Sequence, residues 1–206
     1  MITTYFGSPG CGKTTLAVKM AKKNQKYYDY TFLNFDHKID NGYIANLDKL
    51  GEWTFPDHSF ICIDEAGIEY NSRAYKALPK PAIAWFKKHR HYKCDIAVFS
   101  QSWEDMDVTI RRLSDQLWYV YKIGPFTLSR RIYKRVTVDK QTEQIIDGYR
   151  MANMLWLLIW FLQLDKGLFV PKFKLTFRPF YYKYFDSYSK DNIPVNLHKK
   201  VGESRT

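Results

Sequence analysis

The sequence lacks paired cysteines and any apolar run of the roughly 20 residues that a membrane-spanning helix needs. Its three cysteines, Cys11, Cys62 and Cys94, are isolated and have neither disulfide nor metal-ligand spacing. We therefore expect a chain that works in a reducing interior, where the thiols pack as small apolar groups. The N-terminus has no basic start followed by an apolar stretch, so we expect no secretory signal.

Acidic residues are scarce. The chain has 32 Lys and Arg against 21 Asp and Glu, which gives a formal net charge of +11. Residues 71–94 contain seven basic residues and no acid, and residues 110–135 contain seven against Asp115 alone. This excess indicates an anionic partner, either nucleic acid or lipid headgroups, but a solvated helix face and an exposed basic hairpin explain it equally well.

Apolar material is sufficient for one α/β domain with an appendage, because hydrophobic residues make up 46% of the 206 positions. Short apolar runs predict buried strands at residues 2–6, 30–35, 60–63, 95–100 and 117–121. Helical patterns at 14–24, from Pro81 to Arg90 and after Asp107 alternate with them. The alternation predicts a three-layer α/β fold with a mostly parallel five-stranded sheet and ligands at the strands' carboxyl ends.

The first strand is followed by a phosphate-loop motif that matches at every required position. We assign nucleotide binding to this segment: Gly7, Ser8, Pro9, Gly10, Cys11, Gly12, Lys13, Thr14 and Thr15. The glycines allow backbone N–H groups to surround an anion at a helix N-terminus. Lys13 is expected to reach the β- and γ-phosphates of ATP, and the Thr14 hydroxyl to bind Mg²⁺. The alternative is a glycine-rich turn without a ligand.

Two carboxylates, Asp64 and Glu65, follow the apolar strand at 60–63. Paired with the phosphate loop, Asp64 is expected to hold Mg²⁺, directly or through water, and Glu65 to act as general base for the attacking water. Alone, two acids at a strand end are also common as helix caps. A glutamate after the magnesium ligand, with a strand between the two motifs, favours the motor-type, glutamate-switch branch of P-loop NTPases over kinases and GTPases.

Gln101 ends the strand at 95–100, where it is expected to orient water or sense the γ-phosphate. The alternative role is a loop glutamine bonded to backbone. Arg73, Arg111 and Arg112 are candidates for an arginine finger, which offsets transition-state charge and in motor rings usually comes from a neighbouring subunit. For each arginine, a solvated surface position is the competing explanation.

Several stretches together resemble the zonular occludens toxin family, which is shared with filamentous-phage assembly ATPases. Tyr70-Asn71-Ser72-Arg73 is similar to that family's aromatic-Asn-Ser/Thr-Arg stretch. The similarity extends over residues 1–138 and reappears near 180–188, and its other segments are residues 7–15, 61–67, 85–101, 107–113 and 184–188. The phosphate-loop motif is generic, so the specificity of the resemblance comes from the Asn-Ser-Arg stretch and from residues 85–101.

The resemblance implies a membrane-associated ATPase that drives assembly and export of filamentous virions and is related to DNA-translocating motors. It implies that Lys13 and Thr14 bind nucleotide, that Asp64 and Glu65 serve Mg²⁺ and hydrolysis, and that Gln101 monitors the γ-phosphate. Arg73 and Arg111 remain candidate fingers. Phage members usually continue into a membrane span and an outer domain, whereas the printed chain ends at Thr206. We carry over neither that span nor the toxin activity in the family name.

We expect a P-loop core at residues 1–125, a C-terminal β- and aromatic-rich extension at 126–190, and a polar tail at 191–206. The extension contains an uncharged segment, residues 151–164, whose 14 residues span only about 21 Å as a helix. A bilayer core is ~30 Å thick. A buried helix or subunit interface, an interfacial membrane anchor with Trp156 and Trp160, and a true span all stay open. Residues 169–184 are expected either to stack single-stranded DNA or to form a strand on the core.

The sequence therefore predicts a homo-oligomeric, motor-type ATPase for phage assembly, export or DNA movement, at the inner face of a host cell membrane. Single-stranded DNA, coat or assembly proteins and an anionic membrane are its candidate partners. The alternative is a nucleotide-dependent scaffold that binds a membrane or coat partner and scarcely hydrolyses ATP. A small-molecule kinase is disfavoured, because no acceptor-site lid is evident.

Overall fold

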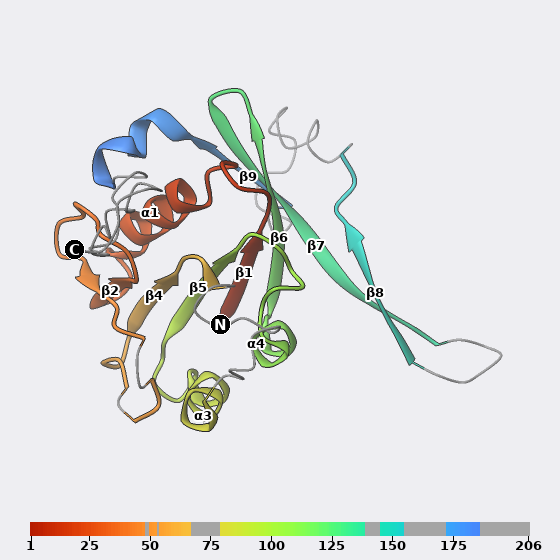
Figure 1. Cartoon of the computed structure of the whole chain (residues 1–206), viewed down its shortest axis with the longest axis horizontal. Helices are drawn as coiled ribbons and strands as arrows, with labels where there is room; N and C mark the ends of the chain where they lie inside the picture. Colours follow the sequence, from red (N-terminus) through yellow and green to blue (C-terminus); the bar gives the residue numbers. More distant parts are fainter. Residues whose placement is uncertain (48–49, 53, 67–78, 139–144, 155–171, 186–206) are drawn as a thin grey trace, which may run out of the picture.

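A single mixed β-sheet organises the computed structural model, which describes residues 1–47, 50–52, 54–66, 79–138, 145–154 and 172–185 (Figure 1). Nine strands form it in the order β3-β2-β4-β5-β1-β6-β7-β8, with β9 paired to β7. The six strands from β3 to β6 in this order are parallel to one another. The α/β class with a mostly parallel sheet is therefore confirmed.

The strands predicted from apolar runs are all present. They are β1 (Ile2–Phe6), β2 (Tyr30–Leu33), β4 (Ser59–Ile63), β5 (Asp95–Ser100) and β6 (Gln116–Ile123). The structure adds a sixth parallel strand, the two-residue β3 (Tyr43–Ile44), whose length gave no periodic signal in the sequence. β5 pairs with both β1 and β4, so one strand separates the strand before the phosphate loop from the strand before the acidic pair. This is the order expected for the motor-type branch.

Helices cover both faces of the parallel sheet and produce three layers (Figure 1). On one face α1 (Lys13–Asn24) buries Leu16, Ala17 and Ala21 against alternate residues of the central strands. On the other face α3 (Lys80–Lys88) and α4 (Val108–Leu113) bury Trp85, Phe86 and Ile110. The Asp107 carboxylate caps α4 by accepting a 2.7 Å hydrogen bond from the Thr109 N–H, as its position before the helix predicts.

The C-terminal part continues the same sheet with antiparallel strands. β7 (Phe126–Val138) pairs along β6 and then with β8 (Ile145–Met151), and the β7–β8 ribbon extends away from the helices (Figure 1). β9 (Phe173–Phe177) pairs with the first residues of β7 and leads into the 3₁₀ helix η1 (Arg178–Tyr184). η1 returns to α1, so the end of the described chain packs beside the phosphate-loop helix.

Several predictions fall wholly or partly outside the described residues. Arg73, most of the uncharged segment at 151–164 and the tail at 191–206 belong to this group. Among the helices that the structure does describe, none combines the length and apolarity needed to cross a membrane. β7 begins directly after residue 125 and pairs along β6, so the sheet continues across the predicted domain boundary. The division into a core and an extension at this residue therefore stays a prediction.

Candidate functional site

Six of the nine predicted nucleotide-binding residues line a cavity of about 710 Å³ at the carboxyl end of the parallel strands, whereas Gly7, Ser8 and Cys11 do not line it. Its wall is formed by the phosphate loop, the acidic pair, the end of β5 and η1, through Pro9, Gly10, Gly12, Lys13, Thr14, Thr15, Asp64, Glu65, Gln101, Arg178, Tyr182 and Phe185. The position agrees with the rule that ligands of parallel α/β sheets lie outside the strands' carboxyl ends.

The phosphate loop has the backbone that its glycines predict. Gly10 and Gly12 have φ of 72° and 95°, in the left-handed region that L-residues rarely adopt. A Cβ on Gly12 would also lie 2.1 Å from the Thr127 hydroxyl oxygen, and that hydroxyl donates a 2.8 Å hydrogen bond to the Cys11 carbonyl. β7, from the C-terminal part of the chain, therefore supports the loop directly.

Lys13 is 8% exposed and its ammonium lies inside the loop. It donates to the carbonyl oxygens of Gly7 at 2.7 Å and Ser8 at 3.1 Å. The side chain is thereby held at the centre of the anion-binding turn, where a phosphate oxygen would meet it together with backbone N–H groups. Cys11 instead points into the core, and burial raises the pKa of its thiol, so it is not a reactive group.

Thr14 and Asp64 meet although 50 residues separate them in the chain. The Thr14 hydroxyl donates a 2.6 Å hydrogen bond to the Asp64 carboxylate, which is 6% exposed. Burial raises the pKa of Asp64, while this hydrogen bond and a 3.0 Å bond from the Glu65 N–H act in the opposite direction. A buried carboxylate beside a hydroxyl is a pair of hard oxygen donors for a divalent cation.

Asn34 and the backbone of Glu65 fix the geometry of the acidic pair. The Asn34 amide accepts from the Asp64 N–H at 2.7 Å and donates to the Asp64 carbonyl at 2.9 Å. Glu65 follows with φ of 52°, an uncommon conformation for a non-glycine residue, and its side chain is exposed at the cavity. Asn34 follows β2, which neighbours β4, so the strand-end rule would have identified it.

Gln101 lines the cavity directly after β5, as predicted. Arg111 does not line it. Arg111 and Arg112 border a separate cavity of about 300 Å³ together with Trp103 and Lys134. The structure therefore does not bring Arg111 to the nucleotide cavity of its own chain.

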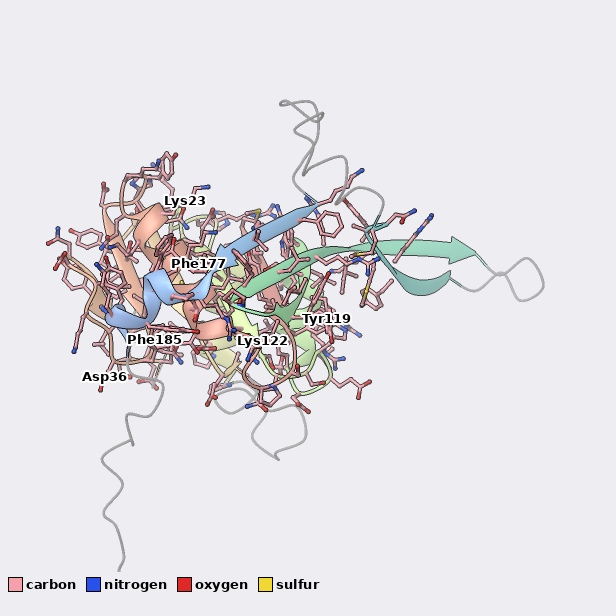
Figure 2. All side chains as sticks on the ribbon, turned by 90° about the horizontal axis from the view of Figure 1, so that it is seen from above. Lys23, Asp36, Tyr119, Lys122, Phe177 and Phe185 are labelled. Atoms are coloured by element: carbon pink, nitrogen blue, oxygen red, sulfur yellow. The ribbon has the colours of Figure 1, made fainter. Side chains whose placement is uncertain are left out.

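Three cavity residues, Arg178, Tyr182 and Phe185, were not predicted as site residues. All three come from η1 and the residue after it, which lie beside α1 in Figure 2, where Phe177 and Phe185 mark the two ends of the segment. The Arg178 guanidinium donates to the Gly124 carbonyl at 2.5 Å and to the Pro125 carbonyl at 3.4 Å. The β6–β7 turn thus holds an arginine at the rim of the phosphate loop.

The donor set fits Mg²⁺ as a phosphate-bound ion rather than as an ion in an all-protein cage. In the described parts of the chain, no three or more His, Cys, Asp and Glu side chains gather as a metal site. Mg²⁺ in nucleotide sites usually takes one or two protein oxygens and completes its shell with phosphates and water. The Thr14 and Asp64 oxygens, 2.6 Å apart, provide that partial set.

A family model described as "Zonular occludens toxin (Zot)" matches residues 21–154. The chain belongs to the Zot family. The match begins inside α1 and ends after β8, so it covers the acidic pair and β5 but not the phosphate loop itself. A search of curated proteins found no match to this Zot-family chain.

Solved structures similar to the Zot-family chain include the N-terminal domain of zonular occludens toxin from Neisseria meningitidis. It is 18% identical, has a TM-score of 0.47, and the match covers 75% of this chain and 96% of that one. The genome packaging NTPase B204 from Sulfolobus turreted icosahedral virus 2, in complex with ATP-gammaS, is 12% identical with a TM-score of 0.46, over 71% and 96%. The flagellar accessory protein FlaH from Methanocaldococcus jannaschii is 13% identical with a TM-score of 0.46, over 71% and 88%.

Proposed function

We propose that this Zot-family chain is a motor-type ATPase that binds MgATP in the 710 Å³ cavity and hydrolyses it. The observation that carries the proposal is the convergence of Lys13, Thr14 and the acidic pair on one cavity, closed by the Thr14–Asp64 hydrogen bond at 2.6 Å. Such a set can bind a triphosphate, neutralise its charge and activate water, the three requirements of phosphoryl transfer to water.

Each residue has a distinct role in the proposed mechanism. Mg²⁺, when bound with ATP, supplies electrostatic stabilisation of the β- and γ-phosphate oxygens. Lys13 turns its ammonium from the loop carbonyls to the phosphates, and Thr14 and Asp64 offer the oxygen ligands. Glu65 accepts a proton from the attacking water at its carboxylate, and Gln101 orients that water or senses the γ-phosphate.

The biological role that we propose is assembly or export of filamentous virions, or DNA translocation, by an oligomer at the cytoplasmic face of a host membrane. Family membership supports it, and the net charge of +11 suits DNA or an anionic lipid surface as the partner. Arg111 stays a candidate finger for a neighbouring chain's site, and its position outside its own chain's nucleotide cavity is compatible with that role. Arg73 stays a second candidate for contributing to a neighbour's site.

ATPase measurements at increasing protein concentration test this function. We expect the rate per chain to rise with concentration, and to rise further with single-stranded DNA or with anionic liposomes, whichever is the partner. Lys13→Ala removes the ammonium from the loop and is expected to abolish both nucleotide binding and hydrolysis. Hydrolysis that persists in Lys13→Ala would overturn the proposal. Tight ATP binding without hydrolysis under all these conditions would instead favour a nucleotide-dependent scaffold.

Arg178 is expected to act on nucleotide bound to its own chain. Arg178→Ala should lower kcat/KM for ATP by about 10- to 100-fold, because a charge-assisted contact to phosphate contributes roughly 1.5–3 kcal/mol. Steady-state kinetics on the purified protein measure this change. Thermal unfolding of the same sample checks that loss of the contacts to Gly124 and Pro125 has not unfolded the chain.

Mixing experiments separate this arginine from one supplied by a neighbour. A chain with Arg111→Ala, mixed with a chain carrying Glu65→Gln, should regain activity, because the intact site of one receives Arg111 from the other. Arg178→Ala mixed with Glu65→Gln should gain no activity over Arg178→Ala alone, because neither chain then has a complete site. Recovery in the second mixture would show that Arg178 acts between subunits.

A further inference from the structure

A second cavity, of about 570 Å³, lies between α1, β9 and the central strands. It shares no lining residue with the nucleotide cavity. The outer turns of α1 provide one wall through Leu16, Lys19, Met20 and Lys23, which are spaced as one face of a helix. In Figure 2, Lys23 lies on one side of η1 and Phe185, which lines the nucleotide cavity, on the other.

Three lysines, Lys19, Lys23 and Lys174, line this second cavity. The Lys19 ammonium donates to the Leu175 carbonyl at 2.6 Å and to the Thr176 hydroxyl at 3.0 Å, which holds it beside β9. The other charged groups on its wall are the N-terminal amine and Asp95. Asp95 is already engaged, because it pairs with that amine and accepts a 2.7 Å hydrogen bond from the Tyr28 hydroxyl. Of the ion pairs found within the described residues, none includes any of the three lysines. Within the described residues, the wall therefore has more positive than negative charge.

The surroundings of the buried Lys174 ammonium give the strongest indication that this cavity binds an anion. This ammonium donates to the Tyr5 hydroxyl at 2.7 Å and lies 4.1 Å from the centre of the Trp118 ring. Burial, and after it the positive charges of Lys23, Arg131 and Lys19, together lower the pKa of Lys174 to about 8. An ammonium has three donors, and an anion is the group that would satisfy the remaining ones and offset the burial.

Buried polar groups of β7, next to the residues that line this cavity, also lack hydrogen-bond partners within the described residues. Arg131 lies opposite Trp118 in the β6–β7 ladder, and its guanidinium is 5.9 Å from the indole. Its Nε and Nη1 are buried without a hydrogen-bond partner, and so is the hydroxyl of Ser129, the residue opposite Lys174 in the β7–β9 ladder. Buried donors left without partners are uncommon in folded proteins, and they mark this region as built for a polar ligand or ordered water.

The remaining wall is apolar and aromatic. Leu16, Met20, Phe60, Ala97 and Trp118 form it, so the cavity combines a cationic end with an apolar surface. A volume of about 570 Å³ falls in the range of small-molecule sites, which are mostly apolar with a few converging polar groups. A hydrated inorganic ion would leave the apolar surface unused, whereas an anion with an apolar group would fill both parts.

We propose that this cavity binds an organic phosphomonoester, with its phosphate among Lys19, Lys23 and Lys174 and its apolar group against Trp118. Three cations match the dianionic charge of a phosphomonoester better than the single charge of a carboxylate. A free organic phosphate and the headgroup of phosphatidic acid share this chemistry. The inference does not depend on the proposed ATPase, because the two cavities have separate walls.

Titration calorimetry on the full chain carrying Lys13→Ala tests the site, because this background weakens anion binding at the phosphate loop. The probes are phenyl phosphate, a short-chain phosphatidic acid, inorganic phosphate and phenol. We expect saturable binding of at least one of the first two, and which one binds tells the free ligand from the lipid source. Inorganic phosphate should bind about tenfold more weakly, and phenol should not bind measurably, because each lacks one half of the ligand.

Two variants locate the bound probe. Lys174→Met, which replaces a buried ammonium by an apolar group of similar length, and Lys23→Gln should each weaken binding by about tenfold or more. Lys22→Gln is the matched control on α1, because Lys22 lies over the Tyr184 ring at 3.7 Å and does not line this cavity. Absence of saturable binding up to about 10 mM probe, or equal affinity in all three variants, would overturn the proposal.

Discussion

Replacement of Glu65 by glutamine is expected to lower kcat for ATP hydrolysis by about 10²–10⁴-fold, the usual contribution of a general base. The amide keeps the size and hydrogen-bonding capacity of the side chain but cannot accept a proton from water. Because Glu65 is exposed at the cavity and does not line the phosphate loop itself, ATP affinity should change little. Single-turnover hydrolysis and binding of a fluorescent ATP analogue measure the two effects separately.

Two variants separate nucleotide binding from catalysis. Lys13→Ala should lose binding, whereas Glu65→Gln should retain ATP in a stable complex. Glu52→Gln serves as the matched control, because Glu52 is also exposed but lies away from the cavity. A Glu65→Gln chain that turns over ATP at the normal rate would remove the general-base role and leave the acidic pair with Mg²⁺ binding alone.

Local sequence was enough to predict the phosphate loop and the strands that orient it. The motif from Gly7 to Thr14 is contiguous, so its chemistry can be read without knowledge of the fold. The meeting of Thr14 and Asp64 across 50 residues was also predictable, because both follow parallel strands and therefore lie at one edge of the sheet. Strand order followed from the same motifs, and the position of β5 between β1 and β4 confirms it.

The contribution of the C-terminal part could not be predicted in the same way. Arg178 reaches the cavity because β9 pairs antiparallel with β7, which places Phe177 opposite Phe126 and starts η1 at the β6–β7 turn. That register depends on cross-strand packing, for which a short aromatic and basic stretch offers several solutions. Sequence reasoning allowed a strand on the core for this stretch, and β9 is such a strand, but its proximity to the nucleotide site is a property of the tertiary fold.

Substitution of Gly7 by alanine is expected to destabilise the fold strongly by overpacking at the start of the phosphate loop. A Cβ at this position would lie 2.0 Å from the carbonyl oxygen of Val120, which belongs to the backbone of β6. The neighbour cannot move without disturbing the sheet, because β6 pairs with both β1 and β7. Overpacking of this kind usually costs about 1–3 kcal/mol, and contact with rigid backbone places Gly7→Ala at or above the upper end. Urea unfolding measures the change.

Gly124→Ala separates this steric effect from the general cost of replacing a glycine. Gly124 has φ of 52° and no atom within 4 Å of its added Cβ, so only the left-handed backbone is penalised, by about 1–2 kcal/mol. The close approach of Gly7 to the Val120 carbonyl explains why the phosphate loop starts with glycine. The chain leaves β1 directly beside β6 here, and on the other side the Gly7 N–H donates a 3.3 Å hydrogen bond to the Ser100 carbonyl of β5. Equal unfolding midpoints for the two variants would show that β6 yields at this point and that the loop tolerates a side chain there.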